Sequence, residues 1–467
     1  MKRIALIGAG SVVFGKNVMA DVLWHDALKG CELRLMDINE ERLDTARRTA
    51  ESVNRVLKGG AKIVATTDRK RAVDGADVVI CTINVGGYEA TKVDHAIPRR
   101  FGVQQTVGDT MGPGGVFRAA RNIPEVLRIC DDMALYCPDA LLINYSNPMA
   151  MHCLAIERSR RTFHVGLCHG VQNTAMTLRA IVGMKKAGVT AAAVDTHFKR
   201  RRDTKERVRE WLEWMAMGED SDLSYLCAGI NHMAFFLKFS SGGRDLYEDI
   251  REILEMPHLR RLDPVRFDLC ERLGYFMTET SGHTSEYVPY YLRSKAGIEE
   301  MALRPGSYLQ ACRQQDKWYH SLRNELLAGK EAVETPYTPS VEHVSRILNA
   351  MATGEPYVFN GNVHNAGGAL ISNLPGDACV EVPCTADRNG ITPHHIGELP
   401  PACAAMIGTN INVQDLAVRG ILEGDREYIK QALLLDPNTA STLAPRKIWA
   451  MADAMFEAHK EWLPQFQ

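Results

Sequence analysis

The chain has 467 residues, and its 55 Lys+Arg against 57 Asp+Glu give a formal net charge of −2 at pH 7. Hydrophobic residues make up 45% and charged residues 24% of the sequence, which excludes a disordered or fibrous chain. The near-neutral charge predicts no binding to nucleic acid or to a membrane surface, and no apolar run reaches the roughly 18 residues of a membrane span.

The twelve cysteines are scattered through apolar segments without the spacing of a disulfide framework. In a chain of this length, such usage predicts reduced thiols and a cytoplasmic location. The amino terminus passes from two basic residues directly into a predicted strand and a glycine turn, which is not the pattern of a signal peptide.

Strands and helices alternate over the first third of the chain. The predicted strands cover residues 3–7, 32–36, 62–66, 77–83, 140–145 and 164–168. Helices are expected at residues 12–24 and 40–57 and after the glycine-rich loop 112–115, where Pro124 is expected to kink or divide the helix. This alternation predicts an α/β fold, a Rossmann-like doubly wound parallel sheet.

The pattern changes in the second part of the chain. A basic run at 197–209 is typical of a solvated helix face or a loop. YVFNGNVHN (357–365) and CVEVPC (379–384) are strand-like and lie between glycine and proline turns. The sequence therefore predicts two domains: residues 1–195 bind a nucleotide, and residues 196–467 form an α+β domain for substrate binding and oligomerisation.

A glycine turn follows the first predicted strand. Gly8 and Gly10 open the next helix there, although Val13 stands where a third glycine would complete the dinucleotide fingerprint. Asp37 ends the second strand, where a carboxylate accepts both ribose hydroxyls and disfavours a 2′-phosphate. We therefore expect NAD rather than NADP; the alternative for Asp37 is a helix cap.

Two further segments carry metal-ligand side chains. Cys168 follows the last predicted strand of the first part, and His232 follows Asn231 between two apolar runs. A thiolate and an imidazole together make half of a divalent transition-metal site and leave positions open for substrate oxygens. Taken singly, these residues are as well explained as a buried thiol and a core histidine.

Several long motifs resemble one family over essentially the whole chain. They are IGAGS (7–11), MDI (36–38), VGGYE (85–89), VGDTMGPGG (107–115), NYSNPMA (144–150), GLCHGVQ (166–172), AGINHMA (228–234), TNINVQ (409–414) and LLDPNTA (434–440). The family is glycoside hydrolase family 4, and the closest branch is that of the α-galactosidases (melibiases).

The resemblance implies redox glycoside hydrolysis, an exception to the two-carboxylate scheme. Sugar C3 is oxidised by NAD⁺, the acidified C2 proton is removed, the aglycone is eliminated, water adds and the hydride returns. A divalent metal, usually Mn²⁺ in this family, stabilises the enediolate. The resemblance also implies a homodimer or homotetramer that acts on a small α-glycoside.

The resemblance further implies roles for single positions. Cys168 and His232 match the metal ligands, and His169 is the expected general acid. The base is expected within TETSGHTSEYVPYY (278–291), with three candidates, His283, Glu286 and Tyr287. Asp109 is expected either in catalysis or as a loop brace. The remaining expected contacts are Gly8, Gly10, Ser11, Asp37, Asn84 and Asn144 with the cofactor, and Asn147, Arg118 and Asn231 with the substrate.

The sugar stays open at this point. The residue after Cys-His is often Ser in melibiases, whereas Gly occurs in α-glucuronidases and in some α-galactosidases; here it is Gly170. Arg118 and Arg121 are placed to pair a uronate carboxylate, to contact the cofactor or to form structural ion pairs. We expect an α-galactosidase. The alternatives are an α-glucuronidase or α-galacturonidase, an NAD-dependent 2-hydroxy acid dehydrogenase, and a non-catalytic NAD-binding sensor.

Overall fold

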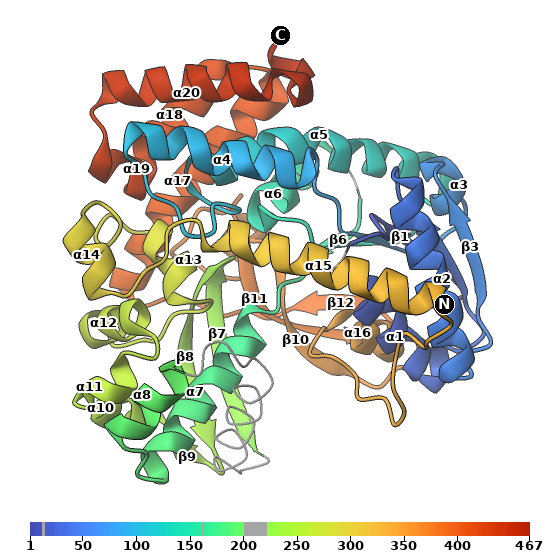
Figure 1. Ribbon diagram of the computed structural model, residues 1–467, viewed down its shortest axis with the longest axis horizontal. Coiled ribbons are helices and arrows are strands. Elements are labelled where there is room, and N and C mark those ends of the chain that lie inside the picture. The colour runs from blue at the N-terminus through green and yellow to red at the C-terminus, as the bar shows by residue number, and fades with distance from the viewer. Residues whose placement is uncertain (12–14, 161, 200–221) are drawn as a thin grey trace.

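One mixed sheet runs through the molecule, with helices on both faces (Figure 1). The computed structural model describes residues 1–11, 15–160, 162–199 and 222–467. The start of the first predicted helix and most of the basic run therefore lie outside the described residues.

The strands join in the order β3-β2-β1-β4-β5-β6-β10-β11-β7-β8-β9, and β12 pairs with β11. Their bounds are β1 (Arg3–Ile7), β2 (Glu32–Met36), β3 (Lys62–Thr66), β4 (Val78–Cys81), β5 (Leu141–Asn144), β6 (His164–Gly166), β7 (Leu223–Ile230), β8 (Met233–Ser241), β9 (Arg244–Asp245), β10 (Tyr357–His364), β11 (Cys379–Asp387) and β12 (Gly390–Pro393).

The helices pack on the two faces and at the rim of this sheet. Their bounds are α1 (Gly15–Trp24), α2 (Glu40–Val56), α3 (Arg69–Val73), α4 (Gly87–Phe101), α5 (Gly112–Tyr136), α6 (Met149–Ser159), α7 (Gly170–Lys186), α8 (Ala191–Lys199), α10 (Tyr247–Leu254), α11 (Pro257–Arg260), α12 (Pro264–Leu273), α13 (Ser281–Glu286), α14 (Lys295–Glu300), α15 (Ser307–Leu327), α16 (Val344–Thr353), α17 (Pro401–Glu423), α18 (Arg426–Leu435), α19 (Pro437–Thr442) and α20 (Pro445–His459).

The first six strands form the predicted parallel sheet. β1 lies between β2 and β4 with parallel register on both sides, so the strand order reverses there, as in a doubly wound fold. Both faces are covered, which explains why β4 is apolar and buried at every position. The predicted Rossmann-like α/β class is confirmed.

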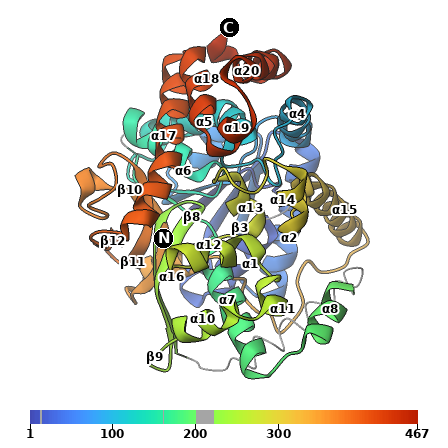
Figure 2. The same ribbon diagram turned by 90° about the vertical axis from the view of Figure 1, so that its left-hand side faces the viewer.

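The later strands extend this sheet instead of building a second one. Asn362 of β10 pairs antiparallel with Gly166 of β6, and β11, β7, β8 and β9 follow outward in antiparallel pairs. The elements between β7 and α14 gather on the left in Figure 1, which is the side that faces the viewer in Figure 2. The α+β content expected after residue 196 is present, but it is joined to the first part through shared strands.

Pro124 neither kinks nor divides its helix: α5 runs unbroken from Gly112 to Tyr136. A proline at this position cannot donate to the carbonyl of Ala120 four residues earlier. The side-chain amide of Gln465 donates to that carbonyl at 2.8 Å. The carboxyl-terminal segment thus supplies the hydrogen bond that the proline cannot make.

A buried ion pair fastens α20 to α4 and α5. Arg121 of α5 makes two hydrogen bonds to Asp94 of α4, at 2.8 and 2.6 Å, and His459 of α20 lies 3.0 Å from the same carboxylate. The Arg121 and His459 side chains have no exposed surface. Of the three roles considered for Arg121, the structure assigns the structural ion pair, so it is not available to a sugar carboxylate.

In the described part of the chain, no helix is long and apolar enough to cross a membrane.

Candidate active site

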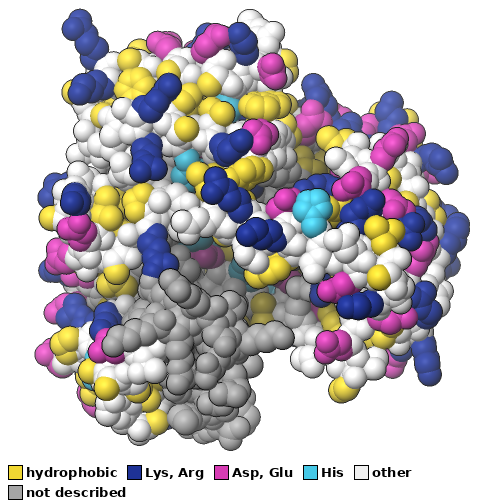
Figure 3. Space-filling view, viewed as in Figure 1, with side chains coloured by type: hydrophobic (Ala, Val, Ile, Leu, Met, Phe, Trp, Pro, Cys, Tyr) yellow, Lys and Arg dark blue, Asp and Glu magenta, His cyan; other side chains and the backbone are white. Residues whose placement is uncertain are grey.

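The glycine turn after β1 is held in tight contact with its neighbours. Gly8 has a φ of +85°, and a Cβ there would lie 2.9 Å from the carbonyl oxygen of Thr82. Gly10 and Ser11 line a cleft of about 800 Å³ that continues along α2 and α15 to the segment 331–338. The surface is hollowed below α15 in the space-filling view (Figure 3). This arrangement leaves the turn open on the side where a pyrophosphate approaches.

Three of the predicted cofactor residues lie at or just beyond the carboxyl ends of strands near this turn. Asp37 accepts from the backbone N–H of Gly10 and of Asn39, both at 2.9 Å. Asn84 is exposed beyond β4. Asn144 is fully buried, and its side chain exchanges two hydrogen bonds of 3.1 Å with the backbone of Ser146. Asn144 therefore shapes the turn after β5 from inside.

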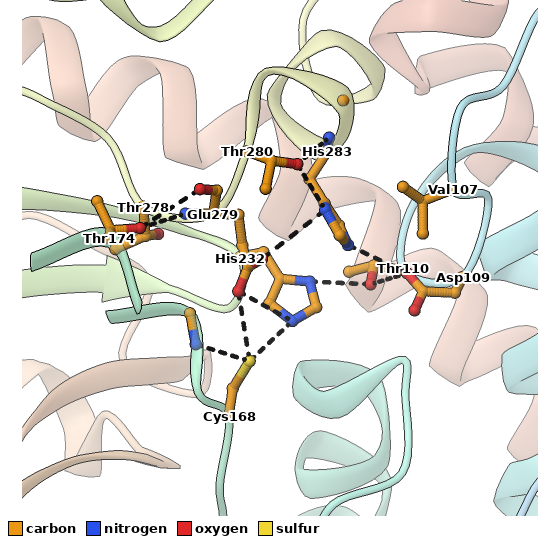
Figure 4. Close-up of polar contacts among 12 residues, drawn as sticks. Val107, Asp109, Thr110, Cys168, Thr174, His232, Thr278, Glu279, Thr280 and His283 are labelled. Atoms are coloured by element: carbon orange, nitrogen blue, oxygen red, sulfur yellow. Dashed lines mark hydrogen bonds and ion pairs between the residues drawn. The ribbon is translucent and has the colours of Figure 1, made fainter. Parts of the chain in front are cut away.

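The structure brings Cys168 and His232 together. Cys168 lies two residues beyond β6, and His232 lies in the two-residue turn of the β7–β8 hairpin. The His232 Nε2 and Cys168 Sγ atoms are 3.2 Å apart (Figure 4). The Cys168 thiol also donates to Glu279 Oε1 at 3.4 Å.

The donor pair fits a divalent transition metal. Ligand bonds of about 2.0–2.3 Å at angles of about 90–109° place two donor atoms roughly 3.0–3.6 Å apart, and the sulfur–nitrogen separation lies within that range. Thiolate and imidazole are the ligands that such cations prefer. The two segments that sequence spacing alone did not connect therefore form one candidate metal centre.

The other nitrogen of His232 points into a polar network. His232 Nδ1 lies 3.1 Å from Thr110 Oγ1 and 3.4 Å from the Tyr287 hydroxyl. Thr110 donates to Asp109 Oδ1 at 2.8 Å, and His283 Nε2 lies 3.8 Å from that oxygen (Figure 4). A metal-ligating histidine is commonly oriented through its second nitrogen in this way.

Burial and charge set the ionisation of these groups. Burial lowers the pKa of His232 to about 4, so its imidazole is neutral and able to bind a metal. Burial also raises the pKa of the Cys168 thiol well above its usual value, and the carboxylates of Glu279 and Glu381 add to this shift. Burial acts to raise the pKa of Asp109 as well, but the charges of His283 and Arg118 outweigh it and lower the pKa to about 2.

His169 is adjacent to Cys168 and partly exposed. Its Nδ1 lies 3.0 Å from Oε1 of Glu342, whose side chain is largely buried. Burial tends to lower the pKa of His169, but the hydrogen bond to Glu342 outweighs it, and the net shift is upward. A histidine paired in this way is held in one orientation by the carboxylate, and its imidazole is able to carry a proton near neutral pH.

The three candidates for the base are placed differently. Glu286 is buried and accepts from the backbone N–H groups of Val107 and Gly108, at 2.8 and 3.0 Å, so it anchors the loop that carries Asp109. Tyr287 is 1% exposed, and its hydroxyl lies beside His232 and Thr110. His283 is partly exposed and lies between Asp109 and Glu279, with its Nδ1 3.7 Å from Glu279 Oε2.

Two of the three expected substrate residues lie near Asp109. Asn147 donates to Asp109 Oδ2 at 3.0 Å, and Arg118 Nε donates to the backbone oxygen of Asn147 at 3.2 Å. Asn231 is 2% exposed, and its side chain lies against Cys168 and Glu381.

Three residues of the site were not singled out from the sequence. Glu279 lies inside the 278–291 segment, but flanking threonines gave no sign that its carboxylate reaches Cys168. Thr110 and Glu342 act through other side chains, and Glu342 comes from the segment before α16, far from His169 in the sequence. Only the folded chain brings these partners together.

The fold and the site together define an α/β protein with a glycine turn after β1 and a cysteine–histidine pair beyond β6, both at the carboxyl ends of the parallel strands. The model of the family 4 glycosyl hydrolases matches residues 3–184, and that of their C-terminal domain matches residues 227–439. An α-galactosidase of Bacillus subtilis is 38% identical over 471 residues, covering 100% of both chains. An α-galactosidase of Rhizobium meliloti is 33% identical over 99% of this chain and 89% of its own.

The chain belongs to the family 4 glycosyl hydrolases and is a glycoside hydrolase. The fold is shared with the 6-phospho-β-glucosidase of Thermotoga maritima, at 20% identity and a TM-score of 0.74, with 98% of this chain and 99% of that chain covered.

Proposed function

We propose that the enzyme is an α-galactosidase that uses NAD and a divalent metal, Mn²⁺ foremost. The observation that carries this proposal is the meeting of Cys168 and His232 at the edge of the sheet where the glycine turn opens its cleft. The two α-galactosidases at 38% and 33% identity support the sugar. The Thermotoga enzyme with the same fold was crystallised with manganese and NAD⁺.

The chain offers one binding place for NAD and a separate one for the metal ion. Gly10 and Ser11 border the cleft for NAD. Gly8 begins the same turn, Asp37 lies at the ribose end, and Cys168 and His232 hold the cation. When bound, NAD⁺ supplies a hydride acceptor for sugar C3, and the cation polarises the oxygens on C2 and C3.

Different residues around the cysteine–histidine centre carry out the two proton transfers of the reaction. His283 takes the C2 proton, because it is the base candidate that is both partly exposed and within 3.8 Å of the carboxylates of Asp109 and Glu279. His169 delivers a proton to the leaving oxygen, and Glu342 holds it in place. Asn147 and Asn231 orient the sugar hydroxyls, and Tyr287 positions His232 from behind.

A second candidate function follows from Arg118. Its side chain is buried and forms no ion pair with a carboxylate in the described part of the chain, although Asp109 lies near enough to influence it. A guanidinium in this setting suits the carboxylate of a galacturonide or glucuronide. Relatives at 25–28% identity include α-galacturonidases.

Substrate deuterated at C2 or C3 tests the proposed chemistry. Because the C3 hydride and the C2 proton are both transferred before the aglycone leaves, we expect a primary isotope effect on aglycone release at one or both positions. Initial rates of p-nitrophenol release from labelled and unlabelled α-galactoside give the measurement. Absence of an effect at both carbons, with chemistry shown to limit the rate, would exclude this route.

A 2-hydroxy acid dehydrogenase would instead accumulate NADH, and an NAD-binding sensor would show no turnover.

We further propose a cytoplasmic location and a homodimer or homotetramer. All twelve cysteines are unpaired, which suits a reducing compartment.

A further inference from the structure

Gly170 faces a space that another side chain fills. It follows Cys168 and His169 and begins α7. A Cβ built on Gly170 would lie 1.7 Å from Oε1 and 2.7 Å from Cδ of Glu279. No side chain at position 170 is compatible with this position of the Glu279 carboxylate.

Glu279 is held in that space by its surroundings. Its backbone N–H donates to Thr174 Oγ1 at 3.1 Å, and Arg266 fixes Thr174 from the other side at 3.0 Å. The φ of Glu279 is +75°, in the left-handed region that residues with a Cβ rarely adopt. Such strain persists where the surrounding structure enforces it, and it is concentrated at functional sites.

The carboxylate lacks an ordinary counter-charge. Its side chain is only 10% exposed, and in the described part of the chain its ion-pair neighbours are the imidazoles of His232 and His283, at 3.9 and 3.7 Å. Oε1 lies instead against the sulfur of Cys168 at 3.4 Å. A buried carboxylate packed on a thiol is costly unless a cation joins them.

We propose that Glu279 is a third protein ligand of the metal and that Gly170 makes room for it. The proposal rests on the proposed function, which places the cation on Cys168 and His232. The three donor atoms are separated by 3.2, 3.4 and 3.9 Å, so a single cation fits among them with ordinary ligand bonds of about 2.0–2.3 Å.

A second group of donors, Asp109, His232 and His283, is also compact. In this second group, both oxygens of Asp109 already accept hydrogen bonds from Thr110 and Asn147, so they are occupied as ligand atoms. The group also contains no thiolate. The cation therefore belongs on the Glu279 side of His232.

Mn²⁺ binding to the NAD-loaded, metal-stripped enzyme tests this assignment by titration calorimetry. Glu279→Gln keeps the shape of the side chain but removes the charged ligand, and we expect Mn²⁺ affinity to fall at least about tenfold. With Co²⁺ in place of Mn²⁺, the thiolate charge-transfer absorption is expected to persist in Glu279→Gln, since Cys168 is intact.

Gly170→Ala is an independent variant for the same Mn²⁺ titration, and it leaves Glu279 unchanged. The added methyl displaces the carboxylate, so Mn²⁺ affinity should fall toward that of Glu279→Gln. The double variant Gly170→Ala/Glu279→Gln should bind no more weakly than Glu279→Gln alone, because both changes remove one interaction. Additive losses in the double variant would contradict the shared role.

Glu381→Gln is the matched control. This buried carboxyl influences Cys168 but lies beside Asn362, at 3.3 Å, and outside the three donors. We expect its Mn²⁺ affinity to match that of the parent. Parental affinity in Glu279→Gln, or an equal loss in Glu381→Gln, would overturn the proposal. If Cys168→Ser also bound both metals as the parent does, the proposed metal site on Cys168 and His232 would itself be wrong.

Discussion

Cys168→Ser is expected to lower kcat/KM for the α-glycoside at least about 100-fold while NAD affinity stays unchanged. A serine hydroxyl does not ionise as a thiol does, so the candidate centre loses the anionic donor that lies 3.2 Å from His232 Nε2. Loss of metal stabilisation worth about 2.7 kcal/mol corresponds to a 100-fold slower reaction. Steady-state kinetics with Mn²⁺, together with NAD titration, measure the two quantities.

Cys403→Ala is the control for this variant. Cys403 is a buried thiol of α17 without a role in the site, and its replacement should leave kcat/KM near the parental value. Parental activity in Cys168→Ser, or equal losses in both variants, would remove the metal role from Cys168.

Asp94→Asn is expected to lower the free energy of unfolding by about 3–5 kcal/mol. The amide keeps the shape of the carboxyl but leaves the guanidinium of Arg121 as an uncompensated charge, and the Arg121 side chain has no exposed surface. The change also weakens the contact with His459, through which α20 is fastened to α4 and α5. Urea denaturation followed by circular dichroism measures the shift in unfolding free energy.

Asp44→Asn provides the comparison at the surface. Asp44 pairs with Arg47 and Arg48 on α2, and all three side chains are about one-third exposed. Its loss should cost no more than about 1 kcal/mol. Equal stabilities of the two variants would mean that the buried pair does not hold α20 in place.

The parallel half of the fold was predictable because its signals are local. The spacing of apolar residues predicts the short strands and the charged helix at 40–57, and the glycines predict the turn. The structure changes only the ends of these elements. β6, for example, ends at Gly166, two residues before the predicted end of this strand. The position of Cys168 at a strand end followed from this half of the fold.

The contacts that complete the site come from residues far apart in the sequence. Periodicity could not show that β10 would pair with β6 and bring the β7–β8 hairpin into the same sheet. The hairpin carries His232 to Cys168, and the backbone at Glu279 carries its carboxylate into the space beside Gly170. The unbroken α5 likewise depends on Gln465, which no local pattern connects to Pro124.

Release of p-nitrophenol from p-nitrophenyl α-galactoside and from the matching α-galacturonide and α-glucuronide is the most direct test. Each assay contains NAD⁺, Mn²⁺ and a thiol reductant, with and without EDTA. The account predicts release from the galactoside that EDTA abolishes and that fresh Mn²⁺ restores, without net NADH. Release from a uronide alone would assign Arg118 to the sugar carboxylate, and galactoside hydrolysis indifferent to EDTA and NAD⁺ would contradict the account.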